Sequence, residues 1–379
     1  MPKLLFDARL LSHPGIGRYL SCLLEAMLSL DPTLQITLLG DETRLRTFKL
    51  YPHVRIQPCR VPIYSWEEQL TMDRFFKNFD LFHVPHFNAP LLAHRCLVVT
   101  IHDLIYLHVK AYQPFPGAQV LLRWKLSSLA RQARRVIAVS QATAEELLRL
   151  FPRLKGKIRV IHEAAHPQFM TNGTKISYEE ARSEMGKRFG LRKSYILSVG
   201  SIREHKNIQG LMKAYERLRE RELVEADLVL VGRLDPRFEK KYAFSRKLRE
   251  NPAIRYLGDL PDEDLRFLYL GATCFVFPSF DEGFGLPALE AMASGVPVVA
   301  SRASSLPEVV GDAALLFNPR EIGALERVLC NVLKDKELRE ELKLKGEARC
   351  RFFSWKKAAS QTLDLYREAL GESGFLKLS

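Results

Sequence analysis

The sequence lacks a long apolar run, because no stretch approaches the roughly 20 residues that a helix needs to span a bilayer. Hydrophobic residues make up 47% of the 379 and are mixed with 27% charged residues, as in an ordinary water-soluble protein. The opening stretch, MPKLLFDARLLSHPGIG, is a poor secretion signal because Asp7 and Arg9 interrupt it, and we expect a first β-strand there. We therefore predict no transmembrane helix and a cytoplasmic location.

Cysteine is sparse and shows no paired spacing. The six cysteines lie far apart without a CxxC pattern, so neither a disulfide framework nor a zinc site is predicted. No aspartate pair of the DxD kind stands at a strand end in the second half, so we also predict no metal and no cofactor. Sequence repeats of about 20–50 residues and low-complexity segments are lacking as well.

Acidic residues are missing from two stretches of a chain whose net charge is +13. Basic residues gather in these stretches: Lys110, Arg123, Lys125, Arg131, Arg134 and Arg135 in the first, and Arg149, Arg153, Lys155, Lys157 and Arg159 in the second. Such patches attract anionic lipid head groups, nucleic acid or a phosphorylated substrate, or they are the solvated surface of a basic protein. A non-enzymatic polyanion binder would explain the charge, but no recognition helix, zinc pattern or aromatic-rich RNA signature is present, so no nucleic-acid partner is predicted.

Short apolar runs alternate with amphipathic stretches along the chain, which favours βα units and largely parallel sheets. Strands are predicted at KLLFDA, QITLLG, DLFHVPHF, CLVVTIH, RRVIAVS and KIRVIHEA, and after the middle of the chain at SYILSVG, DLVLVGR, IRYLGDL, CFVFPS, PVVAS and ALLF. Helical spacing of apolar residues predicts helices at 17–30, 208–221 and 355–370. The pattern is lost between Ala164 and Ser177, which we predict to be a linker between two Rossmann-like domains, 1–170 and 171–354.

The most informative segment is Pro278–Glu290, PSFDEGFGLPALE, a polar loop between a strand and a helix. Ligands of open α/β sheets bind at such loops. Pro287 suits the first helical position, so Glu290 is predicted in the first turn and Glu282 in the loop before it, both facing one site. Gly283 and Gly285 allow close backbone approach, and the helix N-terminus favours a diphosphate, while Glu290 suits a ribose diol. The alternative is a solvated Glu290 beside turn-forming glycines.

A second loop, Ser198–Asn207, carries cations at the end of the second domain's first strand. Arg203 and Lys206 are placed to neutralise a diphosphate as it leaves. A surface role is the alternative for a lone lysine there.

In the first domain, HPGIGRY leads from the opening strand into a helix but lacks the GxGxxG spacing. Gly15 and Gly17 are candidates to cradle a phosphate or sugar, with a simple tight turn as the alternative. His102 closes a strand in TIHD, where an imidazole can recognise hydroxyls or handle protons. His83 and His86 are weaker candidates of the same kind, with packing as the alternative.

These strings together resemble the family 4 glycosyltransferases, retaining enzymes of GT-B fold, over nearly the whole chain. The resemblance is carried by VGSIREHKN, LVLVGR, FVFPSFDEGFGLPALEAMASGVPVVAS and SSLPEVVGDAALLFNP, and by GIGRY, TIHDL and VIAVSQAT, which look like the bacterial O-antigen and capsule mannosyltransferase branch. The resemblance implies two Rossmann-like domains with parallel sheets facing across a cleft. It also implies an acceptor-binding first domain, a nucleotide-sugar-binding second domain, and a C-terminal segment, 355–379, whose helix crosses back to the first domain.

The resemblance also implies roles for single residues. Glu282 contacts the donor sugar, Glu290 holds the ribose, Lys206 binds the diphosphate and His102 contacts the transferred sugar. The predicted catalytic residues are His102, Glu282, Lys206 and Arg203, and the predicted donor-binding residues are Gly15, Gly17, Gly200, Ser201, Gly283, Phe284, Gly285, Leu286 and Glu290. Relatives carry an arginine at the position of Ser201 or of His205, so Arg203 is a candidate substitute.

The predicted reaction moves a sugar, with GDP-mannose favoured over UDP- or ADP-sugars, to a saccharide or lipid-linked saccharide acceptor in cell-surface polysaccharide synthesis. The basic first domain favours peripheral contact with the anionic inner face of the cytoplasmic membrane. A sugar phosphorylase is a rival on the same fold, because fold does not fix reaction.

Overall fold

The computed structural model describes residues 2–90, 96–109, 117–170 and 176–371. The chain forms two compact units, unit 1 (Met1–Glu163 and Ser354–Ser379) and unit 2 (Ala164–Phe353). The units therefore divide after Glu163, seven residues before the end of the predicted first domain. Lys110, residues 171–175 of the predicted linker and residues 372–379 of the predicted last segment lie outside the described residues. Among the described residues, no helix is long and apolar enough to cross a membrane.

Unit 1 is built on a parallel sheet of seven strands in the order β3-β2-β1-β4-β5-β6-β7. Its strands are β1 (Leu4–Asp7), β2 (Ile36–Gly40), β3 (Val54–Pro58), β4 (Leu81–Val84), β5 (Cys96–Ile101), β6 (Arg135–Ala138) and β7 (Ile158–Val160). Its α-helices are α1 (Ile16–Leu30), α2 (Trp66–Thr71), α3 (Asp73–Phe76), α4 (Ile105–His108), α5 (Ala118–Gln132), α6 (Gln141–Leu150) and α16 (Trp355–Leu370). All six strands predicted in this half are present. Sequence reasoning missed β3, a short half-exposed edge strand, VRIQP, that has only two large apolar residues and no apolar run.

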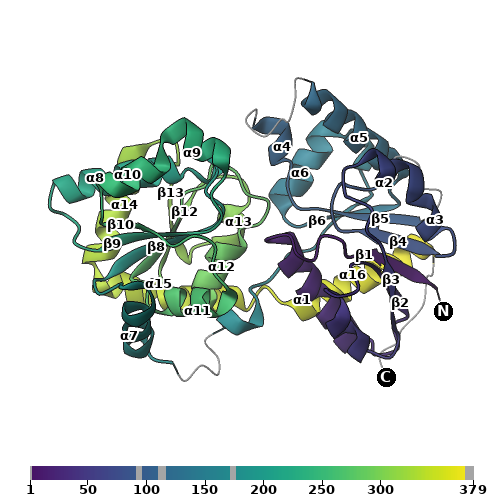
Figure 1. Cartoon of the computed structure of the whole chain (residues 1–379), viewed down its shortest axis with the longest axis horizontal. Coiled ribbons are helices and arrows are strands. Elements are labelled where there is room, and N and C mark those ends of the chain that lie inside the picture. Colours follow the sequence, from purple (N-terminus) through teal and green to yellow (C-terminus); the bar gives the residue numbers. More distant parts are fainter. Residues whose placement is uncertain (1, 91–95, 110–116, 171–175, 372–379) are drawn as a thin grey trace. The chain divides into compact units, whose positions relative to one another are not determined.

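The last helix, α16, belongs to unit 1 and packs along α1 (Figure 1). Its Tyr366 hydroxyl is hydrogen-bonded to Nδ1 of His83 on β4 at 2.5 Å, and Nε2 of His83 to Thr100 on β5 at 2.9 Å. Burial lowers the pKa of His83 to about 3, so the imidazole is neutral inside this network. The predicted return of the C-terminal helix to the first domain is confirmed, and His83 has a packing role.

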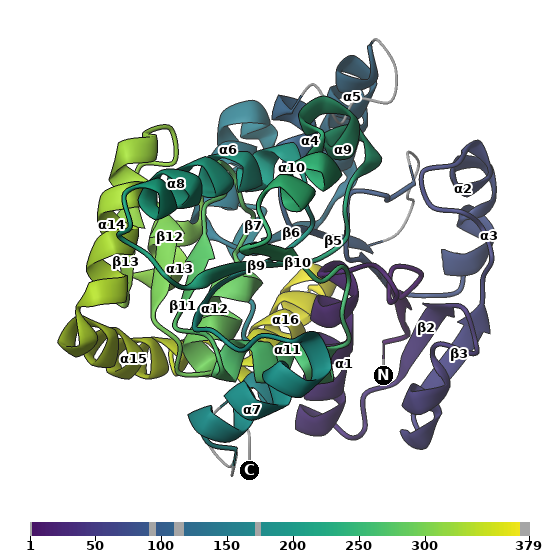
Figure 2. The same ribbon diagram turned by 60° about the vertical axis from the view of Figure 1, so that its left-hand side comes forward.

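Unit 2 has a parallel sheet of six strands in the order β10-β9-β8-β11-β12-β13. Its strands are β8 (Tyr195–Val199), β9 (Asp227–Val231), β10 (Ile254–Tyr256), β11 (Cys274–Phe277), β12 (Val298–Ser301) and β13 (Ala314–Phe317). Its α-helices are α7 (Tyr178–Phe189), α8 (Ile208–Glu220), α9 (Pro236–Tyr242), α10 (Phe244–Glu250), α11 (Asp262–Leu270), α12 (Leu286–Ala293), α13 (Leu306–Val310), α14 (Ile322–Lys334) and α15 (Lys336–Cys350). Figure 2 shows α8 and α10 on one face of this sheet and α11 and α12 on the other.

The six strands predicted for the second half are those observed. Both sheets are parallel throughout and covered on both faces, so their strands are buried apolar runs, which is why the sequence marked them clearly. In each sheet the strand order reverses once, between β1 and β4 in unit 1 and between β8 and β11 in unit 2. Open α/β sheets bind ligands outside the carboxyl ends of the strands at such a switch point.

Candidate active site

The two loops singled out in the second half of the chain follow adjacent strands. β8 pairs with β11, and the loop 200–207 follows β8 while the loop 278–285 follows β11. Both loops therefore leave the sheet at the switch point of unit 2, where the strand order turns from one side to the other. The structure thus brings together two segments that lie more than 70 residues apart in sequence.

An ion pair joins the two loops. Nζ of Lys206 lies 2.6 Å from Oε1 of Glu282, and the two side chains are only 15% and 10% exposed. The ammonium also lies 5.0 Å from the centre of the Phe277 ring, at the end of β11. Gly200, directly after β8, lies close to the same side chain: a Cβ added at Gly200 would be 3.8 Å from the Lys206 side chain. A cation held here is placed to meet an anionic ligand at the switch point.

Backbone and side-chain hydrogen bonds fix the spacing of the loops. The Phe280 N–H donates to the His205 carbonyl at 2.7 Å. Asn207, with a positive φ of 53°, donates its Nδ2 to the carbonyls of Pro278 and Pro319 at 3.1 and 3.2 Å. Asn tolerates this left-handed conformation better than most residues, which accounts for its place directly after Lys206. Asn207 is a positioning residue that sequence reasoning missed.

The loop before α12 is held from behind by two serines. The Ser305 hydroxyl lies 2.9 Å from the Glu282 carbonyl and 2.8 Å from the Phe284 carbonyl. Ser304 contacts the Glu282 carbonyl at 2.8 Å and the Asp281 carboxylate at 2.7 Å. These hydroxyls donate hydrogen bonds to the backbone carbonyls of Glu282 and Phe284 and so hold the loop in place. Both serines belong to the string SSLPEVV, whose contacts are non-local and could not be read from spacing.

Helix α12 begins one residue earlier than predicted, at Leu286, with Gly285 as its N-cap. Gly285 has φ 110°, and an added Cβ there would lie 2.6 Å from the Leu306 side chain. Only glycine fits this turn without strain, as the close-approach argument from sequence required. Pro287 is the second helical residue, not the first, because Leu286 already has helical geometry.

Glu290 therefore lies in the second turn of α12 rather than in the first. It is 1% exposed, and its carboxylate accepts a hydrogen bond of 3.4 Å from the Tyr269 hydroxyl on α11. It is thus neither the solvated residue of the alternative reading nor paired with Lys206 as Glu282 is. Tyr269, which sequence reasoning did not single out, lies beside the predicted ribose-binding carboxylate.

Ser201 and His205, the two positions at which the family resemblance implies an arginine, are uncharged in this chain. His205 is 7% exposed, and burial, reinforced by the charges of Lys206 and Arg203, lowers the pKa of its imidazole to about 2. Ser201, the other position, is a neutral hydroxyl. Arg203 is turned toward Asp235, with Nε 3.6 Å from its carboxylate, which Arg237 also contacts at 2.7 Å. Lys206 is therefore the cation that the structure places at Glu282.

In unit 1 the two glycines of HPGIGRY differ. Gly15 is the N-cap of α1 with φ 80° and open space where a Cβ would be. Gly17 instead packs against its own loop, since an added Cβ would lie 2.0 Å from the Leu11 carbonyl oxygen. Its N–H donates to the His13 carbonyl at 2.7 Å. Gly17 thus has a clear folding role, whereas Gly15 leaves room for a ligand.

His102 lies at the carboxyl end of β5, as predicted. Its Nδ1 is 2.9 Å from Oε1 of Glu163 and its Nε2 is 3.1 Å from the Pro85 carbonyl. The ring packs edge-on against Tyr19, with centroids 4.7 Å apart. Glu163 is 3% exposed and was not singled out from the sequence. His102 belongs to unit 1, whereas Lys206, Glu282 and Glu290 belong to unit 2.

The two basic stretches are partly neutralised within unit 1. Arg159 and Arg135 both pair with Glu368 on α16, at 2.6 and 3.6 Å. Lys157 donates to the Ala130 carbonyl at 3.1 Å. Part of the predicted polyanion patch is therefore a set of internal contacts that hold α16 and the ends of the sheet.

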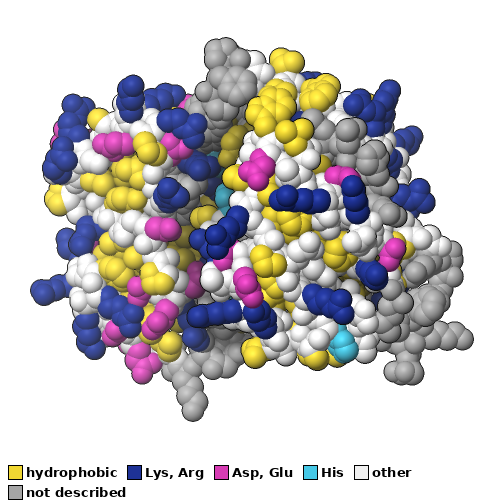
Figure 3. Space-filling view, turned by 45° about the vertical axis from the view of Figure 1, so that its right-hand side comes forward, with side chains coloured by type: hydrophobic (Ala, Val, Ile, Leu, Met, Phe, Trp, Pro, Cys, Tyr) yellow, Lys and Arg dark blue, Asp and Glu magenta, His cyan; other side chains and the backbone are white. Residues whose placement is uncertain are grey.

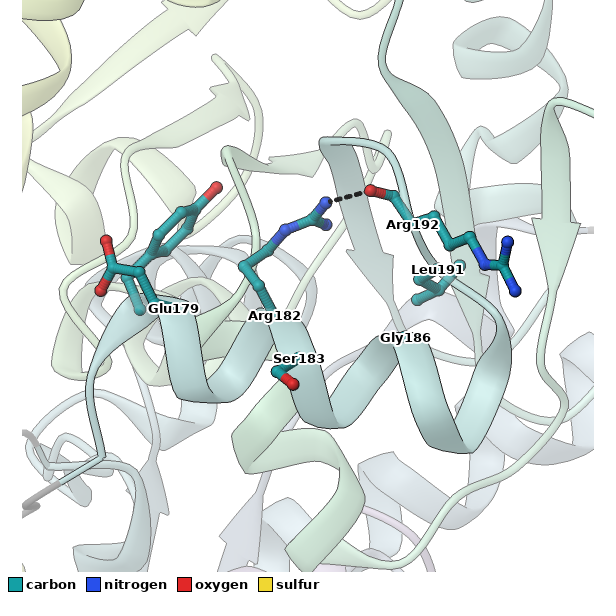
Figure 4. A pocket seen from close by; sticks show the side chains of 7 residues that line it. Glu179, Arg182, Ser183, Gly186, Leu191 and Arg192 are labelled. Carbon is teal, nitrogen blue, oxygen red and sulfur yellow. Dashed lines mark hydrogen bonds between the residues drawn. The ribbon is translucent and has the colours of Figure 1, made fainter.

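Two further features bear on ligands. Among residues 2–90, 96–109, 117–170 and 176–371, no cluster of three His, Cys, Asp or Glu side chains is arranged to hold a metal ion. A surface hollow beside α7 (Figure 4) is lined by side chains such as Glu179 and Ser183, with Nη2 of Arg182 donating to the Arg192 carbonyl at 3.0 Å. None of the predicted site residues lines it.

Solved structures with the same fold share the two-unit architecture. Sucrose-phosphate synthase from Thermosynechococcus elongatus superposes with a TM-score of 0.78 at 20% identity, covering 98% of this chain and 100% of that one. Anabaena HepE in complex with UDP-glucose superposes with a TM-score of 0.76 at 18% identity, covering 97% and 100%. The fold is thus the GT-B fold, two Rossmann-like units with parallel sheets.

Sequence comparison defines the family. Residues 15–169 match the model described as Glycosyltransferase Family 4, and residues 182–349 match that of Glycosyl transferases group 1. The O-antigen chain mannosyltransferase B of Escherichia coli is 30% identical over 96% of this chain and 99% of its own length. The serotype-specific mannosyltransferase WbdA of Escherichia coli is 32% identical over 73% of this chain, which corresponds to 34% of WbdA. The chain belongs to the family 4 glycosyltransferases and is a glycosyltransferase.

Proposed function

We propose that the chain transfers mannose from GDP-mannose to a saccharide or lipid-linked saccharide acceptor in the synthesis of a cell-surface polysaccharide. The names of its relatives support this choice, since mannosyltransferases of O-antigen chains align with it over most of its length. A further relative, the MMP alpha-(1->4)-mannosyltransferase of Mycolicibacterium hassiacum, is 33% identical over 64% of this chain. UDP- or ADP-linked sugars are the alternative donors.

The observation that carries the proposal is the Lys206–Glu282 pair at the switch point of unit 2. A cation and a carboxylate 2.6 Å apart suit two adjoining parts of a nucleotide sugar, the diphosphate and the hydroxyls of the hexose. When the anomeric C–O bond breaks, negative charge grows on the diphosphate, and Lys206 is placed to stabilise it. We propose that this cation, with Arg203 and the loop amides, does so without a bound metal.

The acceptor hydroxyl oxygen then bonds to the anomeric carbon on the face that the diphosphate leaves, and its proton passes to the departing diphosphate, so the configuration is retained. We propose no covalent sugar–protein intermediate. Glu282 contacts the sugar, Glu290 the ribose, and the side chain of His102 contacts the transferred sugar from unit 1. We propose that Gly15 lies beside the donor phosphate.

The test is a transfer assay with GDP-mannose, UDP-glucose and ADP-glucose, each with a mannose-terminated lipid-linked acceptor or with inorganic phosphate alone. We expect mannose to pass to the lipid-linked acceptor with its anomeric configuration retained. Consumption of the nucleotide sugar only with phosphate, or of UDP-glucose only, would contradict the proposal.

We also propose that unit 1 contacts the anionic inner face of the cytoplasmic membrane. Large apolar side chains are exposed on α2 and α5, with Trp66 79%, Val120 71% and Trp124 52% exposed. Figure 3 shows Lys and Arg side chains among hydrophobic ones on the surface. Aromatic side chains and cations together favour the interface of an anionic bilayer. Sedimentation with anionic and neutral vesicles at low salt should show binding to the anionic ones alone, and equal binding would refute the proposal.

A further inference from the structure

A group of aromatic side chains lies at the carboxyl edge of the unit 1 sheet, apart from the residues discussed so far. Phe87 follows β4, and its ring centre lies 5.7 Å from that of Tyr64 and 6.2 Å from that of Tyr106 on α4. Tyr64 and Tyr106 are 50% and 38% exposed. Strands β1 and β4, between which the strand order of unit 1 reverses, end at this edge. Phe87 is 7% exposed and belongs to the core of unit 1, whereas the rings of Tyr64 and Tyr106 on either side of it present aromatic surface at this ligand-binding edge.

Tyr64 has an unfavourable backbone conformation. Its φ is 61°, which is uncommon for any residue other than glycine and strained for a bulky one. The conformation is held by Glu68, whose Oε2 accepts the Tyr64 N–H at 2.8 Å. The Tyr64 hydroxyl is hydrogen-bonded to Nδ1 of His86 at 2.6 Å. Strain of this kind persists where the surroundings force it and is concentrated at binding sites.

A buried network anchors Glu68 in turn. Glu68 is fully buried, and Nη2 of Arg9 lies 2.7 Å from its Oε1 and 2.6 Å from Oδ2 of Asp7. Asn88 donates its Nδ2 to the same two carboxylates at 3.1 and 3.2 Å. Arg9 therefore joins the end of β1 to the first turn of α2. The network makes the position of the Tyr64 ring rigid before any ligand arrives.

The charged groups around the Tyr64 ring include no excess of cations. The carboxylates of Asp7 and Glu68 face the cation of Arg9, and Nζ of Lys125 lies 5.5 Å from the centre of the Tyr64 ring. Burial lowers the pKa of the His86 imidazole well below 6.5, so it is neutral. Asp103 adds a third carboxylate that acts on the Tyr64 hydroxyl, so the groups near the ring carry no excess of positive charge with which to hold a phosphate. Aromatic faces with neutral hydrogen-bonding groups suit an uncharged ring that carries hydroxyls.

We infer that Tyr64 and Tyr106, which flank the buried Phe87 ring, form a subsite of unit 1 for a neutral hexopyranose of the acceptor saccharide. One sugar face packs on the two exposed rings, and the Tyr64 hydroxyl lies beside its hydroxyl groups. The inference rests on the proposed function, since it names where the acceptor of that reaction binds. The inference does not depend on how the loops of unit 2 bind the donor.

The decisive variant is Tyr64→Gly, because glycine accepts the positive φ that strains tyrosine. The variant should therefore remain folded in urea denaturation, because relief of the backbone strain offsets part of the loss of the ring and of its hydrogen bond to His86. Tyr106→Ala is the second variant, and Tyr178→Ala, which removes an exposed tyrosine from α7 of unit 2, is the matched control.

Steady-state transfer from GDP-mannose to a mannose-terminated oligosaccharide gives separate KM values for acceptor and donor. We expect the acceptor KM to rise about twofold to tenfold for each ring removed, with the donor KM and the control unchanged. An acceptor KM unchanged in both folded variants would overturn the subsite and leave the proposed function intact.

If the unmodified protein transfers no sugar, the proposed function fails on its own, and direct binding still tests the subsite. Saturation-transfer difference spectra of the mannose oligosaccharide should then lose intensity in Tyr64→Gly. Equal spectra for the unmodified protein and Tyr64→Gly would overturn the inference.

Discussion

Replacing Lys206 by methionine removes the cation that lies 2.6 Å from Glu282 and keeps a chain of similar size over the Phe277 ring. A hydrogen bond to a charged group contributes about 1.5–3 kcal/mol, which is about 10- to 150-fold in affinity. In the free protein the ammonium already pairs with Glu282, so binding a diphosphate exchanges one partner for another. The lower part of the range is therefore expected, a loss of about 10- to 30-fold in GDP affinity by titration calorimetry.

The same change leaves a carboxylate of 10% exposure without its cation, and a loss of about 1–3 kcal/mol in the free energy of unfolding follows. The double variant, Lys206→Met with Glu282→Gln, removes that unpaired charge, so stability should recover while GDP affinity stays low. Lys213→Met, on the exposed side of α8, is the control and should match the unmodified protein. GDP affinity within twofold of the unmodified protein in Lys206→Met, or affinity that recovers with stability in the double variant, would refute the assigned role.

Three further predictions concern the same unit and the buried histidines. Gly285→Ala should lower both the stability and the GDP affinity, because Gly285 has φ 110° and an added Cβ would lie 2.6 Å from Leu306. The control is Gly323→Ala within α14, which should stabilise the protein by about 0.5–1 kcal/mol in urea denaturation. Glu290→Gln should reduce the rise in melting temperature that GDP produces, and an undiminished rise would place the ribose elsewhere. Burial lowers the pKa of His205 to about 2 and that of His83 to about 3 in the folded protein, whereas both are about 6.5 in the unfolded chain. The free energy of unfolding is therefore highest above pH 6.5 and decreases as the pH falls from 6.5 toward the folded pKa values. Between pH 7.5 and 5.5 each should account for about 1.4 kcal/mol of the loss in urea denaturation, and a stability independent of pH there would contradict this.

Most of the fold could be predicted because both sheets are buried on both faces. Strands such as DLVLV and CFVF are then continuous apolar runs, and helices such as 208–220 show one apolar face. The edge strand Val54–Pro58 is half-exposed and alternates apolar with polar residues such as Arg55 and Gln57, so it contains no continuous apolar run. Local pattern alone therefore locates interior strands and misses exposed edges.

Site residues on loops that directly follow strands could be predicted from the sequence. Contacts between segments that are distant in sequence could not. Lys206 and Glu282 were assigned to one site from their loops, and the pairing of β8 with β11 brings them together. The contact of Glu290 with Tyr269 joins two helices, and its burial could not be inferred from position in a helix. The strain at Tyr64 depends on a buried carboxylate four residues later and has no mark in the sequence.

The account depends most on where the donor lies in unit 2. A crystal structure with GDP-mannose bound measures this directly. The account predicts the diphosphate within hydrogen-bonding distance of Nζ of Lys206, the ribose hydroxyls on the carboxylate of Glu290, and the mannose beside Glu282. Density for the nucleotide elsewhere, with the Lys206–Glu282 pair and the Glu290–Tyr269 contact undisturbed, would contradict it.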